Sequence, residues 1–260
     1  MPIKTKPQGL TNQGPRGITL QSYGNFVYLQ KFRRNILQMN YKEYEKAFSA
    51  ARLAKYKIAC NGNANDALTL YRYNIKLCQK FYGILNVFEV VLRNAIDEHY
   101  KAVFNDKDWI CTQLQKGGML ELAPHRAEVE KTVASLVKQG KYTHDRLVSS
   151  VTFGFWTYLF TKKPFKIGGQ NLLEIFPNRT FGLGQKAIYK ELMQIKSFRN
   201  KIAHHEAVCF DAAGIKSVVP AKYNYELILK YTNFLGYEKN HLFYGLDILP
   251  EVILDKINKL

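Results

Sequence analysis

The chain has 260 residues, of which 47% are hydrophobic, so it is long enough to bury a substantial core and is not a disordered tail. Lysine and arginine outnumber aspartate and glutamate by 38 to 21, which gives a net charge of +17 at pH 7. This excess favours a polyanionic partner such as nucleic acid, although a basic protein without such a ligand can have the same composition.

The cysteines and the apolar runs bear on the cellular compartment. Cys60, Cys78, Cys111 and Cys209 are far apart, and no pair has the spacing of a metal site or a redox motif. The N-terminal residues contain no apolar stretch typical of a signal peptide, and the longest apolar-rich run, 151–160, is about half the length of a membrane span. We therefore expect a soluble, cytoplasmic protein with no metal, no disulfide framework and no membrane partner.

Residues 1–30 are predicted to form a basic N-terminal arm, followed by a single helical domain over 31–260. The arm is rich in Gly, Pro, Gln, Asn and Lys and lacks periodicity. From Tyr41 the apolar and aromatic residues are spaced as in a helix, until "NGNAND" at 61–66 interrupts the pattern. Asp66 is the predicted N-cap of the next helix.

The longest helical pattern covers 67–104 and is interrupted only by Gly83. At about 100° per residue, one apolar stripe forms along it. The stripe consists of Phe81, Leu85, Phe88, Leu92, Ile96 and Val103. We expect this segment to be the central core helix.

A shorter helix is predicted at 121–138, and another is predicted to begin at Thr143 or His144 and to carry "RLVSSVTFGFWTYLF". The aromatic part of this segment could stack on nucleic-acid bases, but an aromatic stripe on a helix more often belongs to a core. Residues 161–184 contain two prolines, four glycines and a basic excess. They are predicted to form a long loop with room for one short helical turn, and loops of that length often carry function.

The next predicted helix runs from about Gln185 to Ala207, and a loop follows it through Pro220. Further helices are expected near 223–235 and from about Pro250 to the end of the chain. No strand pattern of any length and no internal repeat appear, so we predict an all-α fold.

The helix from Gln185 carries "SFRNKIAHHEAV" at 197–208, an unusual cluster of polar groups. Its core stripe is predicted to contain Ile188, Leu192, Ile195 and Ile202. Arg199 falls in the middle of this stripe, where a guanidinium group needs a partner. Two partners meet that need, a buried carboxylate that fixes helix packing or a phosphate of a ligand.

His204 falls on the opposite face of this helix, with Asn200 beside it and with Lys186, Lys190 and Lys201 in the same row. A row of lysines is usually a solvated face. A histidine among them favours another interpretation, because its charge can change near neutral pH, as general acid–base chemistry requires. The three lysines are then candidates for binding the phosphates of RNA.

These residues also carry a family resemblance. The order Arg, Asn, three residues and His in "RNKIAH" matches the motif of the HEPN superfamily. Together with "FEVVLRNAIDEHY" at 88–100 and "VSSVTFGFWTYLF" at 148–160, in that order, it makes the chain resemble the Abi-like (AbiD/AbiF-type) proteins of bacterial abortive infection. The resemblance covers roughly residues 40–210.

The resemblance implies a HEPN-type helical bundle with additional helices and an extended N-terminal arm. It also implies a metal-independent endoribonuclease without a cofactor, in which a ribose 2′-OH attacks the adjacent phosphate and leaves a 2′,3′-cyclic phosphate and a 5′-OH. Arg199, Asn200 and His204 would be its catalytic residues. Such a protein would act as a growth-arresting effector in phage defence. Whether an antitoxin protein or RNA is among its partners is left open by the sequence.

The chemistry of these side chains agrees with that role. His204 can transfer protons, Arg199 can stabilise the phosphorane charge, and Asn200 can orient either of them. Arg199 and His204 lie about 140° apart on a regular helix, so they cannot easily reach one phosphate from the same helix. A homodimer in which two copies of the motif face each other would solve this problem.

A second pair, Arg93 and His99, also fits the superfamily spacing. His99 lies on the apolar stripe of its helix, so we expect it to be a core histidine rather than a catalytic group. On the same helix Glu89, Arg93 and Asp97 are spaced as an i, i+4 charge ladder.

The Abi-like resemblance includes the Glu, Arg and Asn of this helix. It implies that Glu89 is the acid that receives Arg199, and that Arg93 and Asn94 line the site. His205 is expected to be a supporting or solvent-exposed residue.

Two alternatives to a ribonuclease remain. A non-catalytic RNA-binding protein would use the same basic face, and His204→Ala would then leave its affinity and phenotype unchanged. A regulatory HEPN interaction domain that binds a nucleotide or a partner protein would have a deep pocket at the motif instead of an open basic groove.

Overall fold

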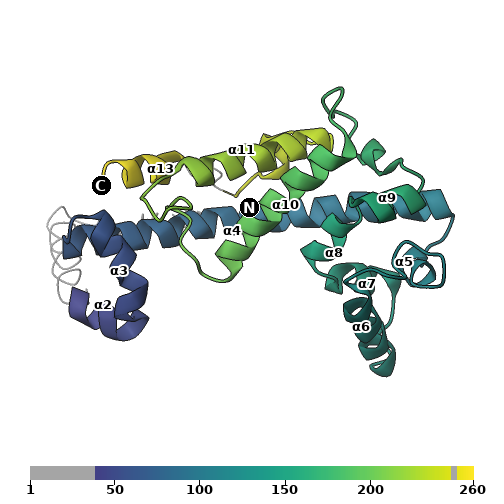
Figure 1. The fold of residues 1–260 in the computed structure, drawn as a ribbon, viewed down its shortest axis with the longest axis horizontal. Helices are drawn as coiled ribbons and strands as arrows, with labels where there is room; N and C mark the ends of the chain where they lie inside the picture. Colours follow the sequence, from purple (N-terminus) through teal and green to yellow (C-terminus); the bar gives the residue numbers. More distant parts are fainter. Residues whose placement is uncertain (1–38, 247–250) are drawn as a thin grey trace, which may run out of the picture. The chain divides into compact units, whose positions relative to one another are not determined.

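The structure is a computed structural model that describes residues 39–246 and 251–260 (Figure 1). The predicted arm, residues 1–30, and the expected helix start at Pro250 lie outside the described residues. The described residues fall into two units, with the boundary between Arg52 and Leu53. Within the described residues all regular secondary structure is helical apart from one isolated antiparallel bridge, so the predicted all-α fold class is confirmed.

The helix expected from Tyr41 to the "NGNAND" segment is interrupted at Ser49, which has a φ angle of 72°. α2 (Tyr41–Phe48) precedes it and begins with a capping box, in which Asn40 and Glu43 each accept the other's backbone N–H. α3 (Ala50–Ala59) follows. The Ser49 hydroxyl accepts the backbone N–H of Arg52 at 3.3 Å and so caps the new helix, as short polar side chains do where they compete with the helical backbone.

The longest helix is α4 (Ala64–Phe104), as the sequence predicts. Its N-cap is Asn63 and not Asp66, because the Asn63 side chain accepts the first free backbone N–H groups of the helix. Five of the six predicted stripe residues are buried. Val103 is the exception, 38% exposed, because it lies in the last turn before the left-handed C-cap at Asn105.

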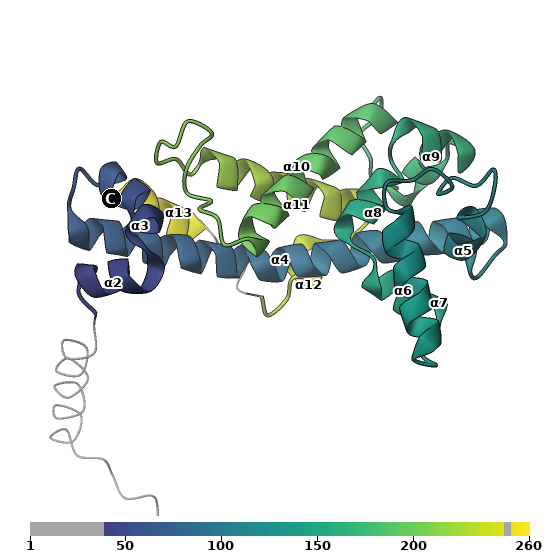
Figure 2. The ribbon, with the colours of Figure 1, turned by 60° about the horizontal axis from the view of Figure 1, so that its bottom comes forward.

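Three helices pack along α4 in both views, α10 (Gln185–Ala203), α11 (Val219–Phe234) and α13 (Glu251–Asn258) (Figures 1 and 2). Aromatic rings fill this interface. The rings of Phe81 and Phe198 meet edge to face at 4.7 Å between centroids, a preferred geometry for buried aromatic pairs. α4 and α10 are thereby held in a defined register. α11 begins earlier than the predicted start at residue 223.

The helix predicted from Thr143 is two helices, α7 (His144–Ser150) and α8 (Phe153–Tyr158), with Val151 extended between them. The Thr143 side chain caps α7 by accepting the backbone N–H of Arg146 at 3.2 Å. α8 packs against both α4 and α10, and its residues from Phe153 to Thr157 are buried. The aromatic run is therefore core, as expected.

The remaining predictions between residues 105 and 184 need correction. α5 (Trp109–Gln113) was not predicted, and α6 (Arg126–Lys138) begins five residues after the predicted start. The long loop contains α9 (Lys162–Ile167) and the 3-10 turn η1 (Leu172–Ile175). Proline begins helices more readily than it continues them, and Pro164 lies in the first turn of α9.

The last short helix before the undescribed gap is α12 (Lys239–Leu242). In the part of the chain that the structure describes, no helix combines the length and the apolar character needed to cross a membrane.

Candidate functional site

The motif residues lie at the C-terminal end of α10, which stops at Ala203 and not at Ala207 as predicted. His204 is the C-cap, and His205 follows in the left-handed conformation with a φ of 58°. The backbone N–H of Glu206 donates to the Lys201 carbonyl at 2.8 Å, and that of His205 donates to the Ile202 carbonyl at 3.1 Å. This is a Schellman ending, which satisfies the last carbonyls of the helix.

Replacing His205 by glycine is expected to stabilise the protein by about 1 kcal/mol, because a side chain at a left-handed position costs about that much. The melting temperature should rise by roughly 2–4 °C for a chain of this length. Thermal unfolding monitored by circular dichroism measures the change. His204→Gly is the matched control: its φ of −89° suits any residue, so this substitution should give no stabilisation. An equal rise for both variants would contradict the assignment.

Arg199 reaches the acid that the sequence resemblance implies. Its Nε donates to the Glu89 Oε2 at 3.3 Å, and this ion pair joins α10 to α4. The side chains of Arg199 and Glu89 are 40% and 22% exposed, so the predicted burial of Arg199 in the core stripe is wrong. Phe198 takes the core position and turns the buried side of α10 away from Arg199. An ion pair this exposed contributes at most about 1 kcal/mol to stability.

Four of the other candidate side chains have no polar partner among the described residues. They are Arg93 and Asn94 on α4, and Asn200 and His204 on α10. The Nε atom of Arg93 is buried and still lacks an acceptor. A buried donor without an acceptor is costly, and an anion supplied by a ligand would remove the cost.

Arg93 follows Glu89 by one helical turn, so it lies beside the carboxylate that holds Arg199. The predicted charge ladder along α4 does not form, because Glu89 pairs with Arg199 on α10. Asp97 pairs with Lys101 on α4 and with His144 on α7. Arg93 makes no ion pair with Glu89, so α4 contributes a second guanidinium group about one helical turn from the Arg199–Glu89 pair. One net positive charge remains there for an anionic ligand.

His99 is half-buried and hydrogen-bonds to the Oδ1 of Asn171 at 3.0 Å, next to η1. Its ring also meets the Tyr100 ring edge to face. A role in joining α4 to η1 accounts for it, although it is not a fully buried core residue as predicted.

The lysines predicted to bind RNA are exposed on α10. Lys186, Lys190 and Lys201 make no ion pair with any carboxylate of the described residues. The acidic residue of α10, Glu191, is turned toward α11, where it accepts from Lys230 at 2.7 Å and from the Tyr231 hydroxyl at 2.8 Å. The exposed face of α10 is therefore basic, as predicted.

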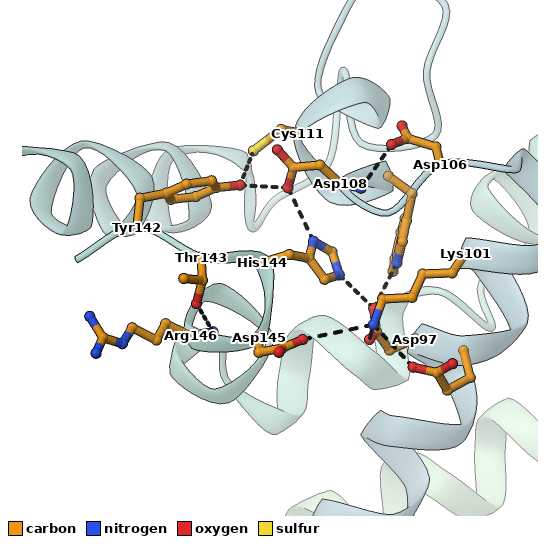
Figure 3. A network of polar contacts seen from close by, with 12 residues as sticks. Asp97, Lys101, Asp106, Asp108, Cys111, Tyr142, Thr143, His144, Asp145 and Arg146 are labelled. Atoms are coloured by element: carbon orange, nitrogen blue, oxygen red, sulfur yellow. Dashed lines mark hydrogen bonds and ion pairs between the residues drawn. The ribbon is translucent and has the colours of Figure 1, made fainter. Parts of the chain in front are cut away.

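A second polar cluster, which the sequence analysis did not single out, surrounds His144 (Figure 3). Nε2 of His144 lies 2.7 Å from Asp97 Oδ1, and Nδ1 lies 3.1 Å from Asp108 Oδ1. Trp109 donates to Asp97 at 2.8 Å, and Lys101 contacts the other oxygen of Asp97 at 2.7 Å. This cluster joins α4, the start of α5 and α7.

The charge state of the cluster follows from its contacts. Burial opposes charge on His144, but the hydrogen bonds to Asp97 and Asp108 outweigh it and raise the pKa of His144. Burial likewise opposes charge on Asp97, but the hydrogen bonds from His144, Lys101 and Trp109 outweigh it and lower the pKa of Asp97. Both ring nitrogens of His144 are occupied, so it has none free for a substrate.

An open pocket of about 400 Å³ adjoins this cluster, lined by Glu98, Lys101, Lys107, His144 and Asp145. Its lining mixes both signs of charge. The cluster is best explained as the polar contact that positions α7 on α4. No local sequence pattern predicts this cluster, because His144 and Asp97 are 47 residues apart in sequence.

All four cysteines are free thiols. Among the residues that the structure describes, no group of three or more His, Cys, Asp or Glu side chains is placed to hold a metal ion. Comparisons of the chain with protein-family models, with curated proteins and with solved structures give no match. Its function is therefore inferred from its own residues.

Proposed function

We propose that the chain is an Abi-like HEPN endoribonuclease that cleaves RNA without a metal ion, and that it acts as a growth-arresting effector in phage defence. The observation that carries this proposal is the guanidinium pair on α4 and α10. Arg199 is held by Glu89, and the neighbouring Arg93 has a buried Nε without an acceptor. A phosphodiester would supply the missing acceptor for Arg93. His204 is exposed at the C-terminal end of α10, the helix that carries Arg199.

The proposed reaction needs two proton transfers and no cofactor. A base takes the proton of the ribose 2′-OH, the 2′-oxygen bonds to phosphorus, and the 5′-oxygen leaves with a proton from an acid. His204 fits either role because its side chain has no polar partner in the described part of the chain. Arg199 and Arg93 would stabilise the negative charge of the phosphorane, and Asn200 would orient the phosphate.

A symmetric homodimer is part of this proposal. Arg199 faces α4 through Glu89, whereas His204 is the exposed C-cap on the other side of α10. Two copies related by a two-fold axis would bring Arg199 of one chain to His204 of the other. Each of the two sites would then combine one Arg199 with one His204. An antitoxin protein or RNA that covers this surface would keep the enzyme inactive.

Purified full-length protein is expected to cleave total RNA in the presence of EDTA, because histidine and arginine carry the proposed chemistry. The products should end in 2′,3′-cyclic phosphate and begin with 5′-OH. Mapping of both ends by selective ligation measures this, since the two end types need different enzymatic treatment before ligation. Activity that EDTA abolishes and magnesium restores would contradict the proposal.

A non-catalytic RNA-binding protein is the second candidate, and the unpaired lysines along α10 favour it equally well. It predicts RNA binding without cleavage, and an affinity that His204→Ala leaves unchanged. The end-mapping experiment separates the two candidates.

A further inference from the structure

The loop before α10 is held firmly to the rest of its unit. Asn178 uses both its backbone and its side chain, donating to the Phe234 carbonyl at 3.3 Å and to the Asn233 carbonyl at 3.0 Å at the end of α11. Arg179 donates to the Leu183 carbonyl at 2.5 Å and so closes the loop on itself. The tip of this loop is therefore positioned by hydrogen bonds on both sides.

The tip itself is a tight turn that presents Phe181. The backbone N–H of Leu183 donates to the Thr180 carbonyl at 3.1 Å, and Gly182 has a φ of 80°. A positive φ at the third residue is typical of a type II turn, which glycine favours. Phe181 occupies the second position and is fully exposed. Single exposed apolar residues are common on protein surfaces, so the surroundings of Phe181 decide its meaning.

Those surroundings are basic. The Gln185 side chain donates to the Phe160 carbonyl, so the start of α10 lies against the start of α9. Exposed lysines lie on α9 and on the first two turns of α10, and none of them pairs with a carboxylate of the described residues. They are Lys162, Lys163, Lys166, Lys186 and Lys190.

The exposed side of α10 continues from this basic region to the candidate site. Lys186, Lys190, Ser197, Lys201 and His204 are all exposed and lie in one row at helical spacing. The 19 residues of α10 span about 28 Å at 1.5 Å per residue. The row therefore connects the Phe181 turn with His204.

We propose that single-stranded RNA binds along this row, with one unpaired base stacked on Phe181 and with its phosphates contacting the lysines. Exposed aromatic rings next to unpaired cations are the combination that binds single strands, because every base has a face to stack and every nucleotide a phosphate. A protein partner that covered Phe181 would have to desolvate several unpaired lysines, which is costly. The inference rests on the proposed function in naming RNA and in placing the scissile phosphate at His204.

Fluorescence anisotropy with a labelled 2′-O-methyl RNA of about 12 nucleotides tests the inference, because this probe lacks the attacking hydroxyl and stays intact. Phe181→Ala in the full-length chain should weaken binding of the single strand about tenfold, whereas Phe181→Tyr should keep it. Binding of a duplex of the same sequence should not change, since its bases are already stacked. Leu122→Ala, at another exposed apolar position, is the matched control and should bind like wild type.

Phe181→Trp adds a direct signal for stacking. Trp109 and Trp156 are fully buried, so an exposed indole at the turn can be followed separately at the red edge of the emission. Single-stranded RNA should quench this emission, and duplex RNA should not. Lys186→Ala and Lys190→Ala should each lower the salt dependence of binding by roughly 0.7 in the log–log slope.

If Phe181→Ala binds single-stranded RNA as tightly as wild type, the inference is overturned. The same conclusion holds if, in addition, light scattering shows that this variant has lost a protein–protein contact, because Phe181 would then serve a protein partner. Failure of the ribonuclease proposal looks different: the wild type would bind the probe through Phe181 and leave unmodified RNA uncut. Conversely, cleavage with an unchanged KM in Phe181→Ala would leave the ribonuclease proposal standing and reject the role of Phe181.

Discussion

His204→Ala is expected to lower the rate of RNA cleavage about 10²–10⁴-fold, the range that one general acid or base contributes. The side chain is exposed at the C-cap and has no polar partner in the described chain, so the free energy of unfolding should change by less than about 0.5 kcal/mol. Single-turnover cleavage and a thermal melt measure the two effects. His241→Ala, at another exposed histidine, is the matched control and should cleave like wild type.

Arg199→Ala should behave like His204→Ala in both assays. Its ion pair with Glu89 is too exposed to stabilise the fold by more than about 1 kcal/mol, so loss of cleavage would not be explained by unfolding. Wild-type cleavage by His204→Ala, or unfolding of that variant, would show that the motif is structural.

Mixing the two inactive variants also tests the composite site. In a two-fold dimer, a mixed pair has one site with Arg199 from one chain and His204 from the other. Random pairing should then restore about a quarter of wild-type activity, since half of the dimers are mixed and each has one intact site. Recovery should depend on protein concentration. No recovery, although both variants fold and pair, would indicate that each chain carries its own complete site.

Asp97→Asn is expected to destabilise the protein by about 3 kcal/mol, because it leaves His144 and Lys101 without their buried acidic partner. The Asp97 side chain is only 5% exposed, so water cannot take over its role. The melting temperature should fall by roughly 6–12 °C for a chain of this length. Urea unfolding gives the free energy directly.

Asp145→Asn is the matched control, since Asp145 lines the same pocket and contacts Lys101 at 3.8 Å but is 90% exposed. Its loss should cost less than about 0.5 kcal/mol. Equal effects of the two substitutions would mean that burial of the cluster does not determine its strength.

The pH dependence of stability follows from the two pKa shifts. The pKa of His144 is raised from 6.5, so its contribution is complete below pH 6.5 and is lost as the pH rises through the raised value. The pKa of Asp97 is lowered from 3.8, so its contribution is present above pH 3.8 and is lost as the pH falls through the lowered value. The difference in unfolding free energy between wild type and His144→Gln should therefore be largest between pH 3.8 and pH 6.5. It should shrink both as the pH rises through the raised pKa of His144 and as it falls through the lowered pKa of Asp97.

The sequence by itself determined the features that depend on local spacing. Apolar residues at a helical period predict α4, its buried stripe and the all-α class, because a stripe of this kind can be buried only as a helix. The same period placed the lysines of α10 on its exposed face, where the structure has them. The pairing of Glu89 with Arg199 came from a family resemblance and not from spacing, and the contact at 3.3 Å agrees with it.

Tertiary structure alone decided the rest. Asp97 and His144 meet across 47 residues, and no local pattern encodes which distant group will share a buried space. The end of α10 at Ala203 depends on a left-handed His205, a conformation that only glycine signals clearly in a sequence. Arg199 lies at the edge of the core because the neighbouring Phe198 packs against Phe81 on α4. Periodicity fixes which face of a helix is apolar, whereas the partner that covers each turn of that face is known only once the helices have packed.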